Sequence, residues 1–134
     1  MPYLLDTNIV SDLIRNPDGL VARRIKEIGE RQIRTSIVVA AELRYGTAKR
    51  GSERLTERME GVLRTLDVRP FEAPGDQSYG LVRSRLEREG APIGANDLLI
   101  AAHALALGCT LVTDNMREFG RVAGLKVENW LRPA

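Results

Sequence analysis

Apolar residues occur along the chain in two patterns, as short continuous runs and as longer segments with helical spacing. The short runs are typical of buried strands. Strands are expected over residues 3–5, 33–36, 68–71, 109–113 and 126–128. Because segments of helical period separate these runs, the pattern favours an α/β fold around a mostly parallel sheet.

The segments between the strands carry apolar residues at three- and four-residue spacing, which predicts amphipathic helices. Asn16 followed by Pro17 is typical of a helix start and predicts a helix that runs to about Gly29. Ser52 can cap another helix, through Leu66. Further helices are expected over 9–15, 37–50, 74–89 and 96–107, the last two ending before glycines.

Length and composition narrow the class of protein. The 134 residues fit one compact unit, so we expect a single domain over 1–134. No apolar run is long enough to span a bilayer, and no basic segment precedes a long apolar stretch, so we expect a cytoplasmic protein without membrane contact. Cys109 is the only cysteine, which excludes an internal disulfide and a cysteine-based zinc site.

Four acidic residues adjoin apolar segments, where an unpaired carboxylate is costly. Asp6 and Asp114 follow predicted strands, Glu42 lies within an apolar helix, and Asp97 opens the most apolar helix. Ligand sites in such sheets lie outside the carboxyl ends of the strands. If the four carboxylates converge there, a divalent cation would relieve their repulsion, and Mg²⁺ or Mn²⁺ prefers oxygen ligands.

Each acid also has a structural explanation, because acids are common at helix starts and in turns. Glu42 could equally lie on the solvent face of its helix. Small polar residues beside the acids could orient carboxylates or metal-bound waters, or could simply form turns and caps. They are Thr7, Asn8, Ser36, Asn96, Thr113 and Asn115. Spacing alone leaves both interpretations open.

The four acids lie in four motifs that resemble those of the PIN-domain family, in the form seen in VapC toxins. The motifs are residues 5–8 (LDTN), 41–46 (AELRYG), 94–104 (GANDLLIAAHA) and 112–115 (VTDN) with Phe119. They occur in the family's order, and the resemblance spans essentially the whole chain. It implies a three-layer α/β/α sandwich and a magnesium or manganese site built from Asp6, Glu42, Asp97 and Asp114.

The same resemblance implies a metal-dependent endoribonuclease that is the toxin of a VapBC-type toxin–antitoxin pair. The expected substrate is RNA, tRNA in particular, and by extension the anticodon loop of the initiator tRNA. Similarity near Tyr45-Gly46 and over residues 117–130 suggests that extension. The expected partners are a VapB-like antitoxin encoded beside the toxin, operator DNA reached only through the antitoxin, and a second copy in a homodimer.

The expected mechanism is metal-assisted hydrolysis, with Asp6, Asp97 and Glu42 as direct ligands and Asp114 acting through water or on a second ion. His103 is the only histidine, which excludes a two-histidine ribonuclease mechanism. The net charge of +2 does not by itself establish nucleic-acid binding. Candidates for a basic rim, each of which could also be ordinary solvated surface, are Arg15, Arg44, Lys49, Arg50, Arg83, Arg85 and Arg88.

Three other functions fit these residues less well. A haloacid-dehalogenase-type phosphatase needs a second aspartate two positions after the first, where this chain has Asn8. A PIN-fold binding module without catalysis needs none of the four acids, and all four are present. A DNA nuclease of related architecture carries additional helical arches, which 134 residues hardly accommodate.

Overall fold

A five-stranded parallel sheet lies at the centre of the computed structural model, which describes residues 2–132. The strand order is β3-β2-β1-β4-β5, and every neighbouring pair is parallel. The strands are β1 (Tyr3–Leu5), β2 (Ile33–Ser36), β3 (Asp67–Arg69), β4 (Thr110–Val112) and β5 (Val127–Glu128). The chain first adds strands on one side of β1 and then crosses to the other side with β4. The order therefore reverses between β1 and β4, where α/β sheets bind ligands.

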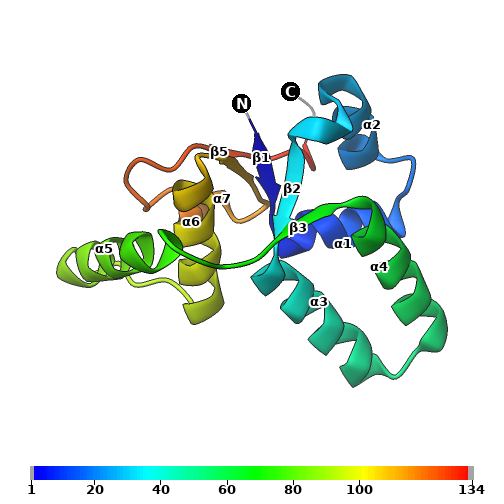
Figure 1. Ribbon diagram of the computed structural model, residues 1–134, viewed down its shortest axis with the longest axis horizontal. Coiled ribbons are helices and arrows are strands. Elements are labelled where there is room, and N and C mark those ends of the chain that lie inside the picture. Colours follow the sequence, from blue (N-terminus) through cyan, green and yellow to red (C-terminus); the bar gives the residue numbers. More distant parts are fainter. Residues whose placement is uncertain (1, 133–134) are drawn as a thin grey trace.

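Helices cover the sheet from both sides and complete three layers (Figure 1). On one side lie α1 (Thr7–Arg15), α2 (Leu20–Ile28), α3 (Ile37–Arg50) and α4 (Glu53–Thr65). On the other side lie α5 (Gly75–Arg88), α6 (Ala95–Leu107) and the one-turn α7 (Met116–Phe119). A short 3₁₀ helix, η1 (Glu30–Gln32), precedes β2. The predicted α/β/α sandwich with a parallel sheet is confirmed.

The core forms where the central strands meet the helices. Leu4 and Leu5 of β1 and Leu111 and Val112 of β4 are fully buried, as expected for strands covered on both faces. Each leucine buried in this way stabilises the fold by about 1.5–3 kcal/mol. Ile100, with Ala101, Ala102 and Ala104, gives α6 its buried face. The apolar runs that predicted the central strands therefore form part of the hydrophobic core.

The predicted start of the second helix is wrong. Asn16 ends α1, because its backbone N–H donates to the Asp12 carbonyl at 2.7 Å and its side chain donates to the Asp12 carboxylate at 2.8 Å. Pro17 lies in the turn that follows, and α2 begins only at Leu20. An Asn-Pro pair favours turns as well as helix starts, so the pattern was ambiguous.

The end of the third strand and one short helix also differ from expectation. The third strand ends at Arg69 instead of Phe71, whose ring packs edge-on against His103 with 5.3 Å between centroids. The helix α7 was not predicted. Within residues 2–132, no helix is both long enough and apolar enough to cross a bilayer.

Candidate active site

The carboxyl ends of β1 and β4 bring Asp6 and Thr113 side by side. Asp6 directly follows β1 and caps α1, where one carboxylate oxygen accepts from the Thr7 backbone N–H at 2.8 Å. The other oxygen accepts from the Thr113 hydroxyl at 2.6 Å. Asp6 is only 4% exposed, and this burial raises its pKa, with further contributions from Glu42 and Glu118, against the lowering effect of the two hydrogen bonds. The carboxylate is thus held in one orientation at a site that disfavours its charge.

Glu42 reaches the same site from the second turn of α3. One of its carboxylate oxygens accepts from the Thr7 hydroxyl at 2.5 Å, and the other accepts from the Asn96 side-chain amide at 3.2 Å. Thr7 belongs to α1 and Asn96 to α6, so these bonds connect three helices. Glu42 is therefore an inward-facing, half-buried carboxylate and does not lie on the solvent face of α3.

Asp97 lies in the first turn of α6 and carries the largest perturbation in the site. Burial is the main cause that raises its pKa to about 7, and the charges of Glu118, Asp6 and Glu42 add to it. A carboxyl hydrogen bond with Glu118 contributes in the same direction. Near neutral pH the Asp97 carboxyl group is therefore partly protonated unless a bound cation displaces the proton.

Glu118, on α7, is a member of this group that the sequence reasoning missed. Its carboxylate accepts from the Gly94 backbone N–H at 2.8 Å and from the Asn115 side-chain amide at 2.7 Å. The Gly94 hydrogen bond is the main cause that lowers the pKa of Glu118. A signal was present, because Asn115 followed three residues later by Glu118 is a capping-box pattern, and Asn115 does accept from the Glu118 N–H.

Asp114 is the most exposed of the four predicted acids and has different hydrogen-bond partners. It is exposed, and its carboxylate accepts from the Asn129 side-chain amide at 2.9 Å. Its backbone N–H donates to the Asn8 side chain at 3.2 Å. Asp114 is not among the main causes of the raised pKa of Asp6 or of Asp97. The structure thus brings Asp6, Glu42 and Asp97 together with Glu118 and leaves Asp114 at the rim.

The predicted small polar residues differ in which of these acids they contact. Thr7, Asn96 and Thr113 bond directly to carboxylates of Asp6 or Glu42. Asn115 bonds to Glu118, and Asn8 bonds to the backbone of Asp114.

Ser36 differs from this expectation. Its hydroxyl accepts from the Val38 N–H as the cap of α3 and lies 2.7 Å from Nδ1 of His103. Its partners are thus the backbone and a buried ring, and no carboxylate is among them.

The charge balance of the site fits a hard cation. Among the described residues, no lysine or arginine forms an ion pair with Asp6, Glu42, Asp97 or Glu118, although Arg121 contributes to the lowered pKa of Glu118. Within residues 2–132, no group of three His, Cys, Asp or Glu side chains is arranged as a complete metal-binding site. Carboxylates that interact without closing suit Mg²⁺ or Mn²⁺, because Mg²⁺ usually keeps several of its waters as ligands.

Known proteins resemble this chain over nearly its whole length. Ribonuclease VapC2 of Rickettsia felis is 40% identical over 132 residues, which cover 97% of this chain and 98% of that protein. The tRNA(fMet)-specific endonuclease VapC of Shigella flexneri is 37% identical, with coverage of 97% and 98%.

Solved structures agree. VapBC2 from Rickettsia felis, bound to a DNA fragment from its promoter, superposes with a TM-score of 0.88 at 37% identity over 97% of this chain and 99% of that one. DNA-bound VapBC from Salmonella typhimurium gives a TM-score of 0.89 at 32% identity, with coverage of 97% and 98%. Residues 3–125 match the family model for the PIN domain. The chain therefore belongs to the PIN domain family, and within it to the VapC group.

Proposed function

We propose that this chain is a metal-dependent endoribonuclease, the toxin of a VapBC-type pair, which hydrolyses phosphodiester bonds in RNA. The observation that carries the proposal is the unbalanced negative charge at the switch point of the sheet, seen most clearly in the pKa of about 7 at Asp97. The similarity of the chain to proteins named as ribonucleases supports the choice of reaction.

In this proposal Asp6, Asp97 and Glu42 hold one Mg²⁺ or Mn²⁺ ion. When bound, the ion supplies a Lewis acid that activates water and stabilises charge on the phosphate. Thr113 and Thr7 keep the carboxylates of Asp6 and Glu42 in position through the bonds described above. In-line attack by water would leave a 5′-phosphate and a 3′-hydroxyl.

Glu118 and Asp114 take different parts. Glu118 is the neighbouring charge that contributes most to the raised pKa of Asp97, and in this proposal it lies beside the ion together with Asp97. Asp114, exposed at the rim, would act through a water molecule or on a second ion. Its bond to Asn129 leaves one carboxylate oxygen for that contact.

The proposed substrate is tRNA, with the initiator tRNA as the specific candidate. Relatives from Shigella flexneri and Salmonella typhimurium, 37% and 34% identical to this chain, are named tRNA(fMet)-specific endonucleases. The proposed partners are a VapB-like antitoxin, operator DNA through that antitoxin, and a second copy in a homodimer. Complexes of VapB with VapC among the solved neighbours, two of them bound to DNA, support the first two.

The rival functions have less support. Asn8, which occupies the position of the second phosphatase aspartate, accepts a hydrogen bond from the Asp114 backbone. A binding module that has lost catalysis would not need to retain a carboxylate whose pKa is displaced so far.

The test is expression of the chain with and without the reading frame beside it, followed by mapping of RNA ends. We expect growth arrest and one discrete set of new RNA ends only when the neighbouring frame is absent. The variant Asp97→Asn should produce neither effect, whereas Asp18→Asn, in an exposed turn, should behave as the parent. Full toxicity of Asp97→Asn would overturn the assignment.

A further inference from the structure

A groove of about 620 Å³ opens beside Glu42, between α1, α3 and α4. Thr7 and Glu42 line it at one end, so it begins at the candidate active site. Arg15, Lys49 and Arg50 also line it, toward the carboxyl ends of α1 and α3. Its remaining lining is largely apolar and includes Ile14, Leu43, Leu55 and Met59. One continuous groove thus joins an acidic end to a basic end.

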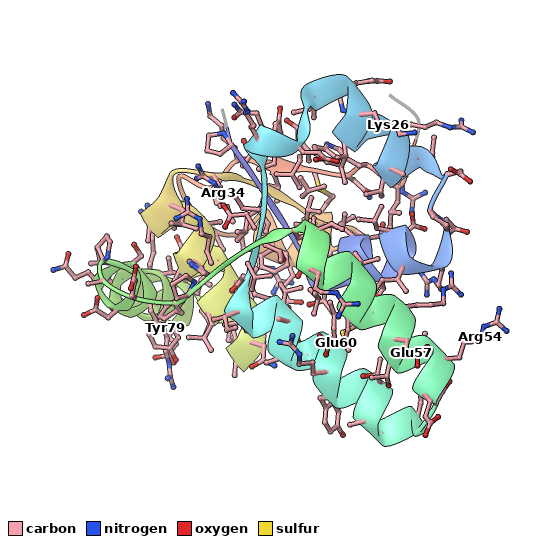
Figure 2. All side chains as sticks on the ribbon, turned by 45° about the vertical axis from the view of Figure 1, so that its right-hand side comes forward. Lys26, Arg34, Arg54, Glu57, Glu60 and Tyr79 are labelled. Carbon is pink, nitrogen blue, oxygen red and sulfur yellow. The ribbon has the colours of Figure 1, made fainter. Side chains whose placement is uncertain are left out.

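The structure separates the candidate basic rim into paired and unpaired cations. Arg44 makes two hydrogen bonds of 3.0 Å to Glu60, which lies on the side of α4 that faces α3 (Figure 2). Arg83 pairs with Glu87 at 3.0 Å and Arg85 with Glu89 at 3.7 Å. These three positive charges are already paired with neighbours, and none of them lines the groove. Arg88, the remaining candidate, forms no ion pair within residues 2–132 but does not line the groove either.

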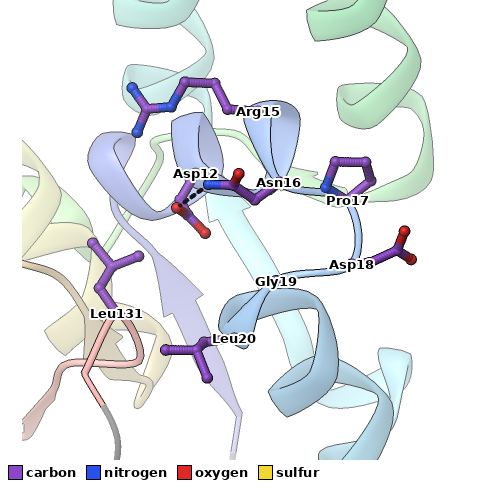
Figure 3. Close-up of a pocket in the computed structure, with 8 residues that line it drawn as sticks. All are labelled: Asp12, Arg15, Asn16, Pro17, Asp18, Gly19, Leu20 and Leu131. Atoms are coloured by element: carbon purple, nitrogen blue, oxygen red, sulfur yellow. Dashed lines mark hydrogen bonds between the residues drawn. The ribbon is translucent and has the colours of Figure 1, made fainter.

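The cations of the groove are exposed and have no such partners. Within residues 2–132, Arg15, Lys49 and Arg50 form no ion pair. Figure 3 shows the Arg15 side chain extending from α1 away from Asp12 and Asp18, the acids nearest to it along the chain. The positive charge of the three groove cations is therefore available to a ligand.

A second hollow, drawn in Figure 3, is less suited to an anion. It measures about 480 Å³ and lies around the α1–α2 turn, where Asp12 and Asp18 line it together with Arg15. Asp12 and Asn16 are bonded to each other there. Two carboxylates outnumber the one cation in this hollow, whereas Arg15, Lys49 and Arg50 all line the groove beside Glu42, which is therefore the better anion site.

The spacing along α3 matches an extended polyanion. Glu42, Gly46 and Lys49 follow one another at four and three residues and so share one face of the helix. Seven residues separate Glu42 from Lys49, which is about 10 Å along the axis. Gly46, between them, has no side chain, and a Cβ built there would meet no atom within 4 Å. A strand can therefore pass from the acidic end to the basic end without obstruction.

We propose that this groove binds the phosphates of the RNA strand that flank the scissile bond. The inference rests on the proposed function, because the scissile phosphate occupies the acidic end together with the cation. The next phosphates lie over Arg15, Lys49 and Arg50, and a ribose or base packs against the half-buried Leu55. A chain of phosphates suits both ends of the groove, because the cation at the acidic end and the basic residues at the other end both attract negative charge. A peptide without the cation would need a positive segment at the acidic end and a negative segment at the basic end.

Binding of unfractionated tRNA to variants that also carry Asp97→Asn tests the proposal, because the RNA then stays intact. The variant Arg15→Gln, Lys49→Gln, Arg50→Gln should bind about 10- to 100-fold more weakly at moderate salt. The slope of log K against log salt should fall by about 2, since each phosphate contact on a single strand contributes about 0.7. Fluorescence anisotropy at several salt concentrations measures both quantities.

The matched control removes the same charge from α5, as Arg83→Gln, Arg85→Gln, Arg88→Gln, and should change affinity less than about threefold. Equal losses in both triple variants would mean that only net charge matters and would overturn the proposal. So would unchanged RNA binding by the groove variant accompanied by loss of binding to the product of the adjacent frame, which would assign the groove to a peptide. Thermal unfolding of each variant confirms that it is folded.

The same experiment separates failure of this inference from failure of the proposed function. If the parent with Asp97 intact cleaves RNA while the groove variant binds RNA normally, the nuclease assignment stands and the groove proposal falls. If the parent cleaves no RNA with Mg²⁺ or Mn²⁺, the proposed function falls first.

Discussion

At the scale of one residue, Asp97 shows the repulsion between the carboxylates of the site. Its pKa of about 7 lies far above the usual 3.8, because burial and three neighbouring carboxylates disfavour its charge. In the unfolded chain Asp97 is ionised above about pH 4, whereas in the fold it still holds its proton up to about pH 7. The metal-free fold therefore binds more protons than the unfolded chain across this window, and its stability falls as pH rises from 4 to 7.

The substitution Asp97→Asn removes that repulsion. In the presence of a chelator at pH 8, we expect the variant to unfold about 2–5 °C above the parent. At pH 5 the difference should be clearly smaller, because Asp97 is then protonated in the folded parent and carries no charge for its neighbours to repel. Circular dichroism melts at the two pH values measure this effect, with Asp18→Asn as the control. A variant that melts at or below the parent at both pH values would refute the repulsion.

Glu118 is the residue whose importance to the site was not predicted. We expect Glu118→Gln to reduce RNA cleavage at least about 10-fold, as loss of a group around a metal site commonly does. It should also lower the pKa of Asp97, because the Glu118 charge is the largest contribution from a neighbouring group. Initial rates at fixed Mn²⁺ across pH 5–9 report both effects. Glu87→Gln, which removes a carboxylate from a surface ion pair, is the control, and equal rates for the two variants would contradict this role.

At the scale of elements, long periodic segments were predictable and short ones were not. The helix over 37–50 was predicted with its observed limits, and the Ser36 hydroxyl caps it by accepting from the Val38 N–H. The one-turn α7 is too short to show a hydrophobic period, so the helix that carries Glu118 was missed. The Asn16-Pro17 error has another cause, since the bond from Asn16 to Asp12 that ends α1 competes with a helix start at the same residue.

Two helices of the site are joined away from it by a buried hydrogen bond. Ser36 caps α3, which carries Glu42, and its hydroxyl lies 2.7 Å from Nδ1 of His103 on α6, which carries Asp97. His103 is 1% exposed, and burial lowers its pKa, so the ring is neutral at pH 7. The contact lies about 9 Å along α6 from Asp97 and fixes one helix against the other.

The value of this contact can be measured against a second serine cap. Ser52 caps α4 through the Leu55 N–H and, among residues 2–132, has no side-chain partner comparable to His103. Ser52→Ala should cost about 1 kcal/mol for the lost cap. Ser36→Ala should cost about 1–3 kcal/mol more, because a buried ring nitrogen also loses its partner. Urea unfolding of both variants gives the difference, and equal losses would mean that the bond to His103 adds nothing to stability.

At the scale of the whole molecule, the sequence predicted the architecture and the general position of the site. The apolar strands predicted a parallel sheet, and acids at the ends of β1 and β4 indicated its carboxyl edge. Which charges pair depends on contacts between distant residues, as between Arg44 and Glu60. Spacing could not therefore separate the unpaired cations of the groove from arginines that are already neutralised, nor place Asp114 at the rim.

The central claim is that the carboxylates around Asp97 bind a divalent ion that RNA cleavage requires. The most direct test is the rate of cleavage of tRNA by the purified protein as Mn²⁺ is titrated, for the parent and for Asp97→Asn. We predict that cleavage by the parent is abolished by EDTA and restored by Mn²⁺ to saturation, and that the folded variant remains inactive at every concentration. Undiminished cleavage by the parent in EDTA, or by Asp97→Asn in Mn²⁺, would contradict the account.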